Sequence, residues 1–287
     1  MEPQILSSSI IQNFIPARKS ASRKGDNGIV LVIGGSYIYH GAPILSSLAA
    51  LRCGTDLVYT SVPKINVSAT RSTSPNLIVI PLVDQKLTLG AVKKLVGALP
   101  RNLHSATIGM GLAIQEKNSL LHLVESLLNR DVRLSLDASA LIPEVLPLLA
   151  NKNVVVTPHA GEFKRLFGDA PSDSKNERIQ LVEKHALDNG VTILLKGPTD
   201  IISNGNTTYL CQKNTPAMTV GGTGDVLSGL VAGLLSNNRN SLESAAAAAF
   251  ICGLTGKQVQ DKLGLHMTSM DLIDAIPSIM KPFDKII

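Results

Sequence analysis

The sequence predicts an α/β fold in which a mostly parallel sheet lies between two layers of helices. Three observations lead to this prediction. Short apolar runs alternate with longer segments of helical periodicity along nearly the whole chain. Several of the runs are apolar at every position, as strands buried on both faces are. The runs end in glycine or polar residues, and in such sheets ligands bind outside the carboxyl ends of the strands.

Apolar runs predict the strands. The run at 28–35 stays apolar until its two final glycines, and Asn204-Gly205 is a dipeptide that suits the turn of a hairpin over 200–211. Six other segments share the short apolar character and are predicted as strands, namely 56–62, 77–82, 105–111, 132–138, 153–159 and 191–197.

Helical periodicity fills the segments between the predicted strands. Gly54 suits the position after a helix over 42–54, and Asp173 suits the N-cap of a helix over 173–190, with Gly190 near its end. The remaining predicted helices cover 89–99, 118–130, 160–168, 222–237, 241–263 and 268–280.

The composition agrees with one large aliphatic domain. Of the 287 residues, 44% are hydrophobic, 17% are charged and 3% are aromatic. These proportions exclude disorder as the main state. We expect a single domain over residues 1–287, with a basic, solvated leading segment at 1–24.

Charge and cysteine content narrow the function classes. Lys and Arg number 27 against 22 Asp and Glu, a net charge of +5 that suits a small phosphorylated ligand better than nucleic acid. Cys53, Cys211 and Cys252 form no CxxC pair, which predicts buried thiols in a reducing cytoplasm rather than zinc ligands or disulfides. No apolar run is long enough for a membrane span, and no signal peptide is expected.

The strongest functional signal is VGGTGDVLSG at 220–229. Its glycines lead directly into an apolar helix, so backbone N–H groups of the first turn can bind an anion. Asp225 lies in that turn and could accept a proton from a hydroxyl, which together with an anion site is what phosphoryl transfer to an alcohol requires. The alternative is that Asp225 only caps the helix, but the small residues Ser228 and Gly229 favour function because they keep the helix start open.

Other strand ends carry weaker signals. In TPHAGEF, His159 and Glu162 share a helical face, where His159 could bind a ligand and Glu162 a magnesium-bound water. A plain helix start is the slightly favoured alternative. Lys196 beside Gly197 could bind a nucleotide, or could belong to an ordinary strand connection. Asp137 could hold a metal or have a structural role.

The remaining glycine turns match no standard phosphate loop. IGGSYIYHG at 33–41 lacks the GxGxxG order, and no Walker A sequence is present. Gly111 within IGMGL could let a ligand approach the backbone closely. Isolated histidines are expected on the surface or in packing, namely His40, His104, His122, His185 and His266.

Taken in order, the motifs resemble the ribokinase-like superfamily and, more narrowly, the NAD(P)H-hydrate dehydratases. The resemblance spans about residues 14 to 280 and implies a three-layer α/β/α ribokinase-like fold. It rests on IPAR, KGDNGIVLVIGGS, GAPILSSLAALRCGTDLVY, IGMGL, LDASAL, TPHAGEF, LLKGPTDII and NTPAMTVGGTGDVLSG. The epimerase domain often fused ahead of such a domain is not expected here.

The resemblance implies repair of hydrated nicotinamide cofactors. The family dehydrates (S)-NADHX or (S)-NADPHX by phosphorylating the C6 hydroxyl and eliminating phosphate, which makes its members lyases that use Mg²⁺ and ADP or ATP. TPHAGEF and GGTGD favour ADP, whereas GAPILS and KGPTDIISNG also resemble ATP-using members. A cytoplasmic homotetramer without nucleic-acid or membrane partners is also implied.

Residue roles follow from the same resemblance. Asp225 would be the base that activates the hydroxyl, in a catalytic loop with Gly222 and Gly224. Glu162 would bind magnesium through water. The substrate would contact Ala42, Gly111, His159 and Asp225. The nucleotide would contact Lys196, Gly197, Pro198, Thr199, Asp200 and Gly224.

Two other functions stay open. A kinase acting on a small hydroxymethyl heterocycle, as in salvage of a thiamine precursor, would use the same anion site and the same Asp225. A nucleotide-binding module without turnover is the second alternative, and the intact Asp225 beside GGTG argues against it.

Overall fold

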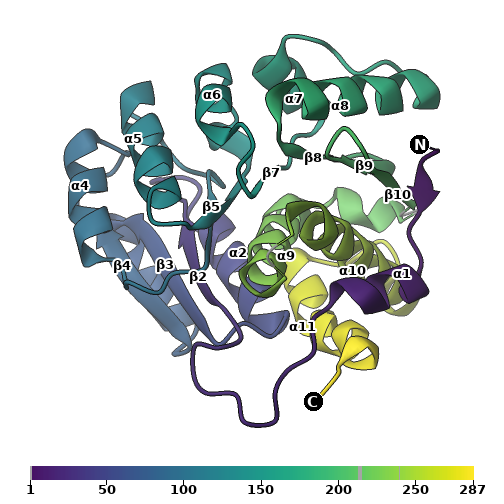
Figure 1. Ribbon diagram of the computed structural model, residues 1–287. Helices are drawn as coiled ribbons and strands as arrows, with labels where there is room; N and C mark the ends of the chain where they lie inside the picture. The colour runs from purple at the N-terminus through teal and green to yellow at the C-terminus, as the bar shows by residue number, and fades with distance from the viewer. Residues whose placement is uncertain (1, 213–214, 239) are drawn as a thin grey trace.

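A ten-stranded sheet runs through the described part of the chain in the computed structural model, which covers residues 2–212, 215–238 and 240–287. The strand order is β1-β10-β9-β8-β7-β6-β5-β2-β3-β4. Strands β2 to β8 are parallel to one another, and β9 runs antiparallel to both β8 and β10. Helices cover both faces of the sheet (Figure 1), which confirms the predicted fold class.

The strands lie where the apolar runs predict them. Each parallel strand of the centre is buried on both faces, which explains why its sequence does not alternate. The bounds are β1 Gln4–Ile5, β2 Ile29–Ile33, β3 Leu57–Pro63, β4 Leu77–Leu82, β5 Ser105–Ile108, β6 Arg133–Leu136, β7 Val154–Val156, β8 Thr192–Leu195, β9 Thr199–Ser203 and β10 Thr208–Gln212.

The helices form one layer on each face. Helices α4, α5, α7 and α8 pack on one side, and α1, α2, α9, α10 and α11 on the other. The bounds are α1 Ser8–Phe14, α2 Gly41–Arg52, α3 Val67–Thr73, α4 Leu89–Ala98, α5 Lys117–Leu128, α6 Leu146–Leu149, α7 Ala160–Phe167, α8 Lys175–Asn189, α9 Thr223–Asn237, α10 Ser241–Leu263 and α11 Ser269–Met280.

Two predicted helix ends are confirmed and one predicted N-cap is wrong. Gly54 and Gly190 have φ of +97° and +59°, the left-handed backbone expected just after a helix. Helix α8 begins at Lys175 with Ser174 as its N-cap, not Asp173. The backbone N–H of Ser174 donates to Ser172 Oγ (2.9 Å), so a side-chain turn occupies this segment and the helix starts after it.

The leading segment contains more structure than its basic composition predicts. Strand β1 adds to the sheet beside β10, and α1 buries Ile11 completely against the α10 layer. Arg18 and Lys19 are exposed, as expected. The apolar residues at positions 10, 11 and 15 are the signal that the prediction overlooked.

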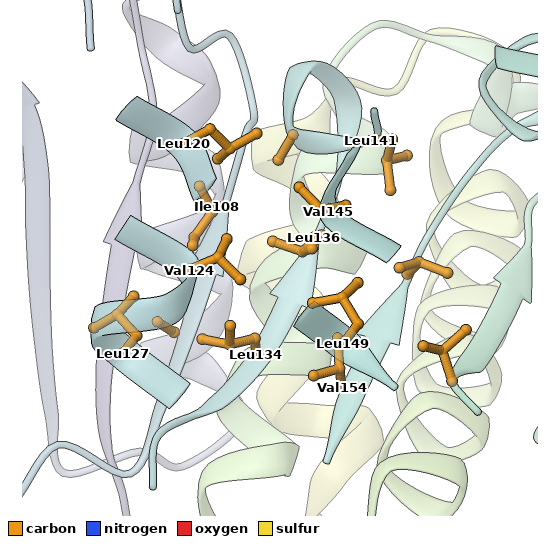
Figure 2. Close-up of a cluster of buried hydrophobic side chains, with 14 of the residues drawn as sticks. Ile108, Leu120, Val124, Leu127, Leu134, Leu136, Leu141, Val145, Leu149 and Val154 are labelled. Carbon is orange, nitrogen blue, oxygen red and sulfur yellow. The ribbon is translucent and has the colours of Figure 1, made fainter. Parts of the chain in front are cut away.

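The aliphatic core fixes the strand ends that carry the site. Figure 2 shows side chains of β5, β6, β7, α5 and the segment after β6 packed into one cluster. Ile108, Leu136 and Val156, at or near the carboxyl ends of three adjacent strands, are fully buried. Truncating such a residue to Ala costs about 2–5 kcal/mol. In the described part of the chain, no helix is long and apolar enough to cross a membrane.

Candidate active site

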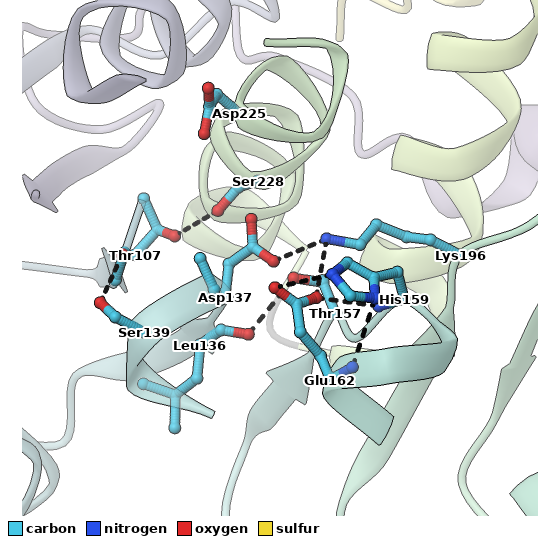
Figure 3. A network of polar contacts seen from close by, with 12 residues as sticks. Thr107, Leu136, Asp137, Ser139, Thr157, His159, Glu162, Lys196, Asp225 and Ser228 are labelled. Atoms are coloured by element: carbon cyan, nitrogen blue, oxygen red, sulfur yellow. Dashed lines mark hydrogen bonds and ion pairs between the residues drawn. The ribbon is translucent and has the colours of Figure 1, made fainter. Parts of the chain in front are cut away.

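Polar residues from distant parts of the chain meet at the carboxyl ends of the parallel strands. Asp137 follows β6, Thr157 follows β7 and Lys196 follows β8. Across from them, the first turn of α9 carries Asp225 (Figure 3). The sheet topology therefore assembles the site at the edge where the sequence predicts ligand binding.

A glycine turn starts helix α9 and sets the position of Asp225. Gly222, the N-cap, has φ of +93°, and a Cβ there would lie 2.6 Å from Leu45 Cδ1 and 2.7 Å from Ser269 Oγ. Another residue would therefore be both strained and crowded. Asp225 is the third residue of the helix and so lies in the first turn, whose backbone N–H groups have no helical carbonyl as partner.

Contacts along α9 hold this helix start in place. Ser46 of α2 donates a hydrogen bond to the carbonyl of Asp225 (2.7 Å), and Ser228 is hydrogen-bonded to Thr107 of β5 (2.7 Å). A Cβ at Gly229 would lie 2.1 Å from the carbonyl oxygen of Ser46. The small residues after Asp225 thus allow α9 to pack tightly on its neighbours, a reason that differs from the open helix start expected from the sequence.

The environment of Asp225 favours its protonated form. Partial burial and, secondly, the nearby carboxylate of Asp137 raise the pKa of Asp225 to about 7, although Lys196 acts in the opposite direction. A carboxyl group with that pKa exchanges a proton readily near neutral pH. This is the property that a general base needs.

Lys196 is the cation at the centre of the site. Its Nζ lies 2.8 Å from Asp137 Oδ1 and 3.5 Å from Glu162 Oε2. Burial alone would lower the pKa of Lys196, but the carboxylates of Asp137 and Glu162 outweigh it and raise the pKa above its usual value. The ammonium group is therefore held charged although most of the Lys196 side chain is buried.

His159 has a structural role as the N-cap of α7. Its Nδ1 accepts hydrogen bonds from the backbone N–H groups of Gly161 (3.0 Å) and Glu162 (3.3 Å), and Glu162 accepts one from His159 N (2.9 Å). This capping box is the plain helix start that the sequence slightly favours. The His159 side chain is nevertheless 60% exposed and lines a cavity.

Two cavities flank the cluster of Asp137, Lys196 and Asp225. The larger, of about 660 Å³, is lined by His159, Lys196, Gly197, Pro198, Thr215, Pro216, Met218, Thr219, Thr223, Gly224, Leu227 and Cys252. The smaller, of about 430 Å³, is lined by Ser36, Tyr39, Ala42, Gly109, Gly111, Leu112, Ala113, Ala138, Ser139 and Asp225. Gly224 and Asp225 are consecutive, yet they line different cavities.

This division separates most of the predicted site residues into two groups. Lys196, Gly197, Pro198 and Gly224, predicted for the nucleotide, line the larger cavity together. Ala42, Gly111 and Asp225, predicted for the substrate, line the smaller one. His159 was predicted with the substrate group, but it lines the larger cavity with the nucleotide group.

Thr199 and Asp200 do not line either cavity. Thr199 begins β9 and is half-buried, while Asp200 is completely buried. Asp200 Oδ1 accepts a hydrogen bond from the backbone N–H of Gly197 (3.0 Å). Asp200 therefore shapes the turn that presents Gly197 and Pro198 to the larger cavity.

Asp137 is the residue whose importance sequence reasoning left open. It is buried, and the backbone around it is unusual. A Cβ on Gly109 would lie 1.9 Å from the carbonyl oxygen of Asp137, and Ala138 has φ of +48° although it is not glycine. Ser139 donates to the carbonyl of Gly109 (2.7 Å) and closes this arrangement. Backbone strain of this kind is typical of functional sites.

The described residues form no cage of protein ligands around a metal ion. No group of three or more His, Cys, Asp or Glu side chains that could hold a metal ion occurs among them. Asp137 and Glu162, however, share the single charge of Lys196. Their surplus negative charge fits a magnesium ion that keeps most of its water and binds nucleotide phosphates.

Sequence comparisons point to one family. The family model described as NAD(P)H-hydrate dehydratase matches residues 30–278. The ADP-dependent (S)-NAD(P)H-hydrate dehydratase of Nitrosopumilus maritimus is 80% identical over 286 residues, covering 100% of both chains. The protein of the same name from Cenarchaeum symbiosum is 60% identical over the same extent.

Longer relatives and solved structures agree. The bifunctional NAD(P)H-hydrate repair enzyme Nnr of Pyrobaculum aerophilum is 42% identical to this chain. The match covers 93% of this chain and 53% of the length of that protein. The ADP/ATP-dependent NAD(P)H-hydrate dehydratase of Bacillus subtilis, co-crystallised with ATP and Mg²⁺, superposes with a TM-score of 0.85 at 25% identity and covers 99% of this chain and 100% of that one. A ribokinase-like superfamily protein from Enterococcus faecalis shares the fold, with a TM-score of 0.83 at 24% identity over 98% of this chain and 96% of that one.

Proposed function

The chain belongs to the NAD(P)H-hydrate dehydratase family, and we propose that it converts (S)-NADHX and (S)-NADPHX to NADH and NADPH with ADP as the preferred phosphoryl donor. One observation supports this most strongly. Gly224 lines a large cavity and Asp225 lines a small one, so the first turn of α9 touches both. A phosphoryl group can pass from a nucleotide in one cavity to an alcohol in the other at this turn.

The larger cavity is the proposed nucleotide site. Pro198, Met218 and Leu227 give it an apolar wall that suits an adenine ring. Lys196 and the first-turn N–H groups of α9 supply positive charge for the phosphates. Gly224 leaves the approach open, because the nearest atom to a Cβ there would be Lys196 Nζ at 3.7 Å.

The smaller cavity is the proposed site of the hydrated nicotinamide ring. Ala42 and Gly111 leave room on its walls, and Asp225 contributes a carboxylate to its lining. With the C6 hydroxyl beside Asp225, the carboxylate accepts the hydroxyl proton as the oxygen attacks the β-phosphorus of ADP. A bond forms between the C6 oxygen and phosphorus, and AMP leaves with the electrons of the broken P–O bond.

Phosphorylation makes the following dehydration easier, since phosphate is a far better leaving group than hydroxide. The C6–O bond breaks with its electron pair going to phosphate, assisted by the ring nitrogen. Loss of a proton from C5 restores the C5–C6 double bond. The balance is (S)-NADHX plus ADP giving NADH, AMP and inorganic phosphate.

Lys196 and its carboxylate partners support the transfer electrostatically. Asp137 and Glu162 position the Lys196 ammonium near the phosphoryl path, at 2.8 and 3.5 Å. A fixed cation of this kind stabilises charge that develops on the phosphoryl oxygens. Magnesium, when bound by Glu162 through water and by the nucleotide phosphates, would neutralise further phosphate charge.

The test is turnover with each nucleotide. The protein is incubated with (S)-NADHX, Mg²⁺ and either ADP or ATP, and the return of NADH absorbance is followed with the amount of AMP or ADP formed. We expect one NADH for each phosphoryl group used and a higher kcat/KM with ADP. No recovery of NADH here, with a stable phosphoester formed when a hydroxymethyl heterocycle replaces (S)-NADHX, would favour the kinase alternative.

We also propose that the chain forms one domain and acts as a cytoplasmic homotetramer. A single sheet that continues from β1 to β4 across the described residues supports the first point. The low charged fraction of 17% agrees with surface hidden between copies. Sedimentation velocity of the full chain tests the tetramer, which a monomeric boundary would exclude.

A further inference from the structure

The loop between β2 and α2 exposes three consecutive large apolar side chains. Tyr37, Ile38 and Tyr39 are 69%, 73% and 64% exposed. Aromatic residues make up only 3% of this chain, so two exposed tyrosines two positions apart are notable. Contiguous exposed apolar surface on a folded domain commonly marks a binding site.

This loop continues the wall of the smaller cavity. Tyr39 lines that cavity together with Ala42, Gly111 and Asp225. Gly111 has φ of +65°, and a Cβ there would lie 2.8 Å from both the Cβ and the carbonyl oxygen of Tyr39. The absence of a side chain at Gly111 is therefore what lets Tyr39 lie against the cavity floor.

Hydrogen bonds hold the loop in this conformation. The backbone N–H of Tyr39 donates to Ser36 Oγ (3.1 Å), and Asn66 Nδ2 donates to the carbonyl of Ser36 (2.8 Å). Helix α2 begins two residues after Tyr39. The tyrosine ring thus projects from a fixed support, which keeps the entropy cost of binding small.

We propose that Tyr39, extended outward by Tyr37, is a stacking site for the adenosine half of the hydrated dinucleotide. The inference rests on the proposed function. A cavity of about 430 Å³ is near the lower end of the range for drug-sized ligands, about 300–1,000 Å³, and a dinucleotide is larger than such a ligand. With the C6 hydroxyl at Asp225, the remainder of the substrate leaves the cavity along its wall.

Stacking fits the chemistry of the adenosine half, which extends out of the smaller cavity. The hydrated nicotinamide ring is not aromatic, whereas adenine, beyond the pyrophosphate, presents an aromatic face. Stacking of a base on an aromatic side chain contributes about 1–3 kcal/mol. The loop would therefore distinguish whole dinucleotides from mononucleotides while leaving the chemistry at Asp225 unchanged.

The experiment compares two substrates on matched variants. We measure kcat and KM for (S)-NADHX and for hydrated reduced nicotinamide mononucleotide, which lacks the adenosine half. Tyr39→Ala raises KM for (S)-NADHX by about 5- to 150-fold, with little change in kcat and none in KM for the mononucleotide. Tyr39→Phe keeps the ring and the wild-type KM. Tyr37→Ala has a smaller effect, and Leu187→Ala, an exposed apolar residue of α8, has none.

Several outcomes would overturn the proposal. Equal losses on both substrates would mean that Tyr39 shapes the reacting end instead. Unchanged KM values would mean that the loop does not contact the substrate. A smaller assembly of Tyr37→Ala in sedimentation velocity would mean that a second copy of the chain covers the loop. If the wild type does not turn over (S)-NADHX, the proposed function is wrong, and stacking is then tested by binding alone. A Kd for NADH, measured by fluorescence, that is the same in Tyr39→Ala and the wild type would refute stacking.

Discussion

The two cavities are built in different ways although they share one helix start. Side chains such as Pro198, Met218 and Leu227 form the larger cavity. Backbone turns at Gly109, Gly111 and neighbouring small residues form much of the smaller one. The larger cavity therefore depends on apolar side-chain contact, whereas the smaller one depends on the absence of side chains.

This difference predicts how substitutions in each cavity should act. At Gly109 and Gly111, φ is +125° and +65°, and an added methyl group meets backbone atoms at 1.9 and 2.8 Å. In the larger cavity, removing a side chain leaves the backbone intact. Substitutions on the two sides should affect different ligands, and Asp225 should affect the chemistry between them.

The largest effect is expected from Asp225→Asn, at the junction. Losing a general base lowers kcat by about 10²- to 10⁴-fold. The Kd for ADP should stay within about threefold, because the larger cavity is unchanged. Stopped-flow absorbance and calorimetry measure the two quantities. Asp271→Asn is the control, since Asp271 is a first-turn carboxylate of α11 outside the site; comparable turnover in both variants would remove Asp225 from the role of base.

The next largest effect is expected from Gly111→Ala, which tests whether the two cavities bind different ligands. The alanine is strained at φ of +65° and presses on Tyr39. We expect KM for (S)-NADHX to rise about tenfold or more, with the Kd for ADP unchanged. Gly97→Ala, where no atom lies within 4 Å of the added Cβ, is the matched control in α4. A larger loss of ADP affinity than of substrate affinity would assign the cavities the other way.

The pH dependence of kcat/KM tests whether Asp137 raises the pKa of Asp225. The ionised form of Asp225 is the active base, and its pKa is raised to about 7, so activity rises as pH increases through about 7. Asp137→Asn removes a negative neighbour that raises this pKa. The acid limb should therefore move to lower pH, and a limb that stays in place or moves to higher pH would contradict this coupling.

Met218→Ala is expected to give the smallest effect. It removes part of the apolar wall of the larger cavity but no backbone contact. The Kd for ADP should rise about three- to tenfold, corresponding to about 1 kcal/mol of lost apolar burial, while KM for (S)-NADHX is unchanged. Met270→Ala, on an exposed part of α11, serves as the control. An effect on (S)-NADHX alone would show that Met218 belongs with the other cavity.

Most of the fold could be predicted because its strands are apolar runs and its helices have clear periodicity. Helix α10, for example, has the predicted bounds of 241–263. Two of the elements that escaped prediction lack such signals. Helix α3, with the sequence VSATRST, is polar and rich in β-branched residues, and β1 is two residues long.

The site was predictable in its parts but not in its arrangement. Glycines before a helix indicated the turn at Gly222 and Asp225, since that signal is local in sequence. The contact between Asp137 and Lys196 joins positions 59 residues apart and exists only because β6 and β8 lie on either side of β7. The capping role of His159 and the burial of Asp200 likewise depend on local geometry that residue type does not give.

Transfer of the phosphoryl group from one cavity to the other is tested most directly by an isotope. (S)-NADHX is prepared with ¹⁸O in the C6 hydroxyl and converted with unlabelled ADP in unlabelled water, and the products are analysed by mass spectrometry. If the hydroxyl oxygen attacks phosphorus, the ¹⁸O appears in inorganic phosphate. Appearance of the ¹⁸O in water, with unlabelled phosphate, would show that the hydroxyl leaves without being phosphorylated.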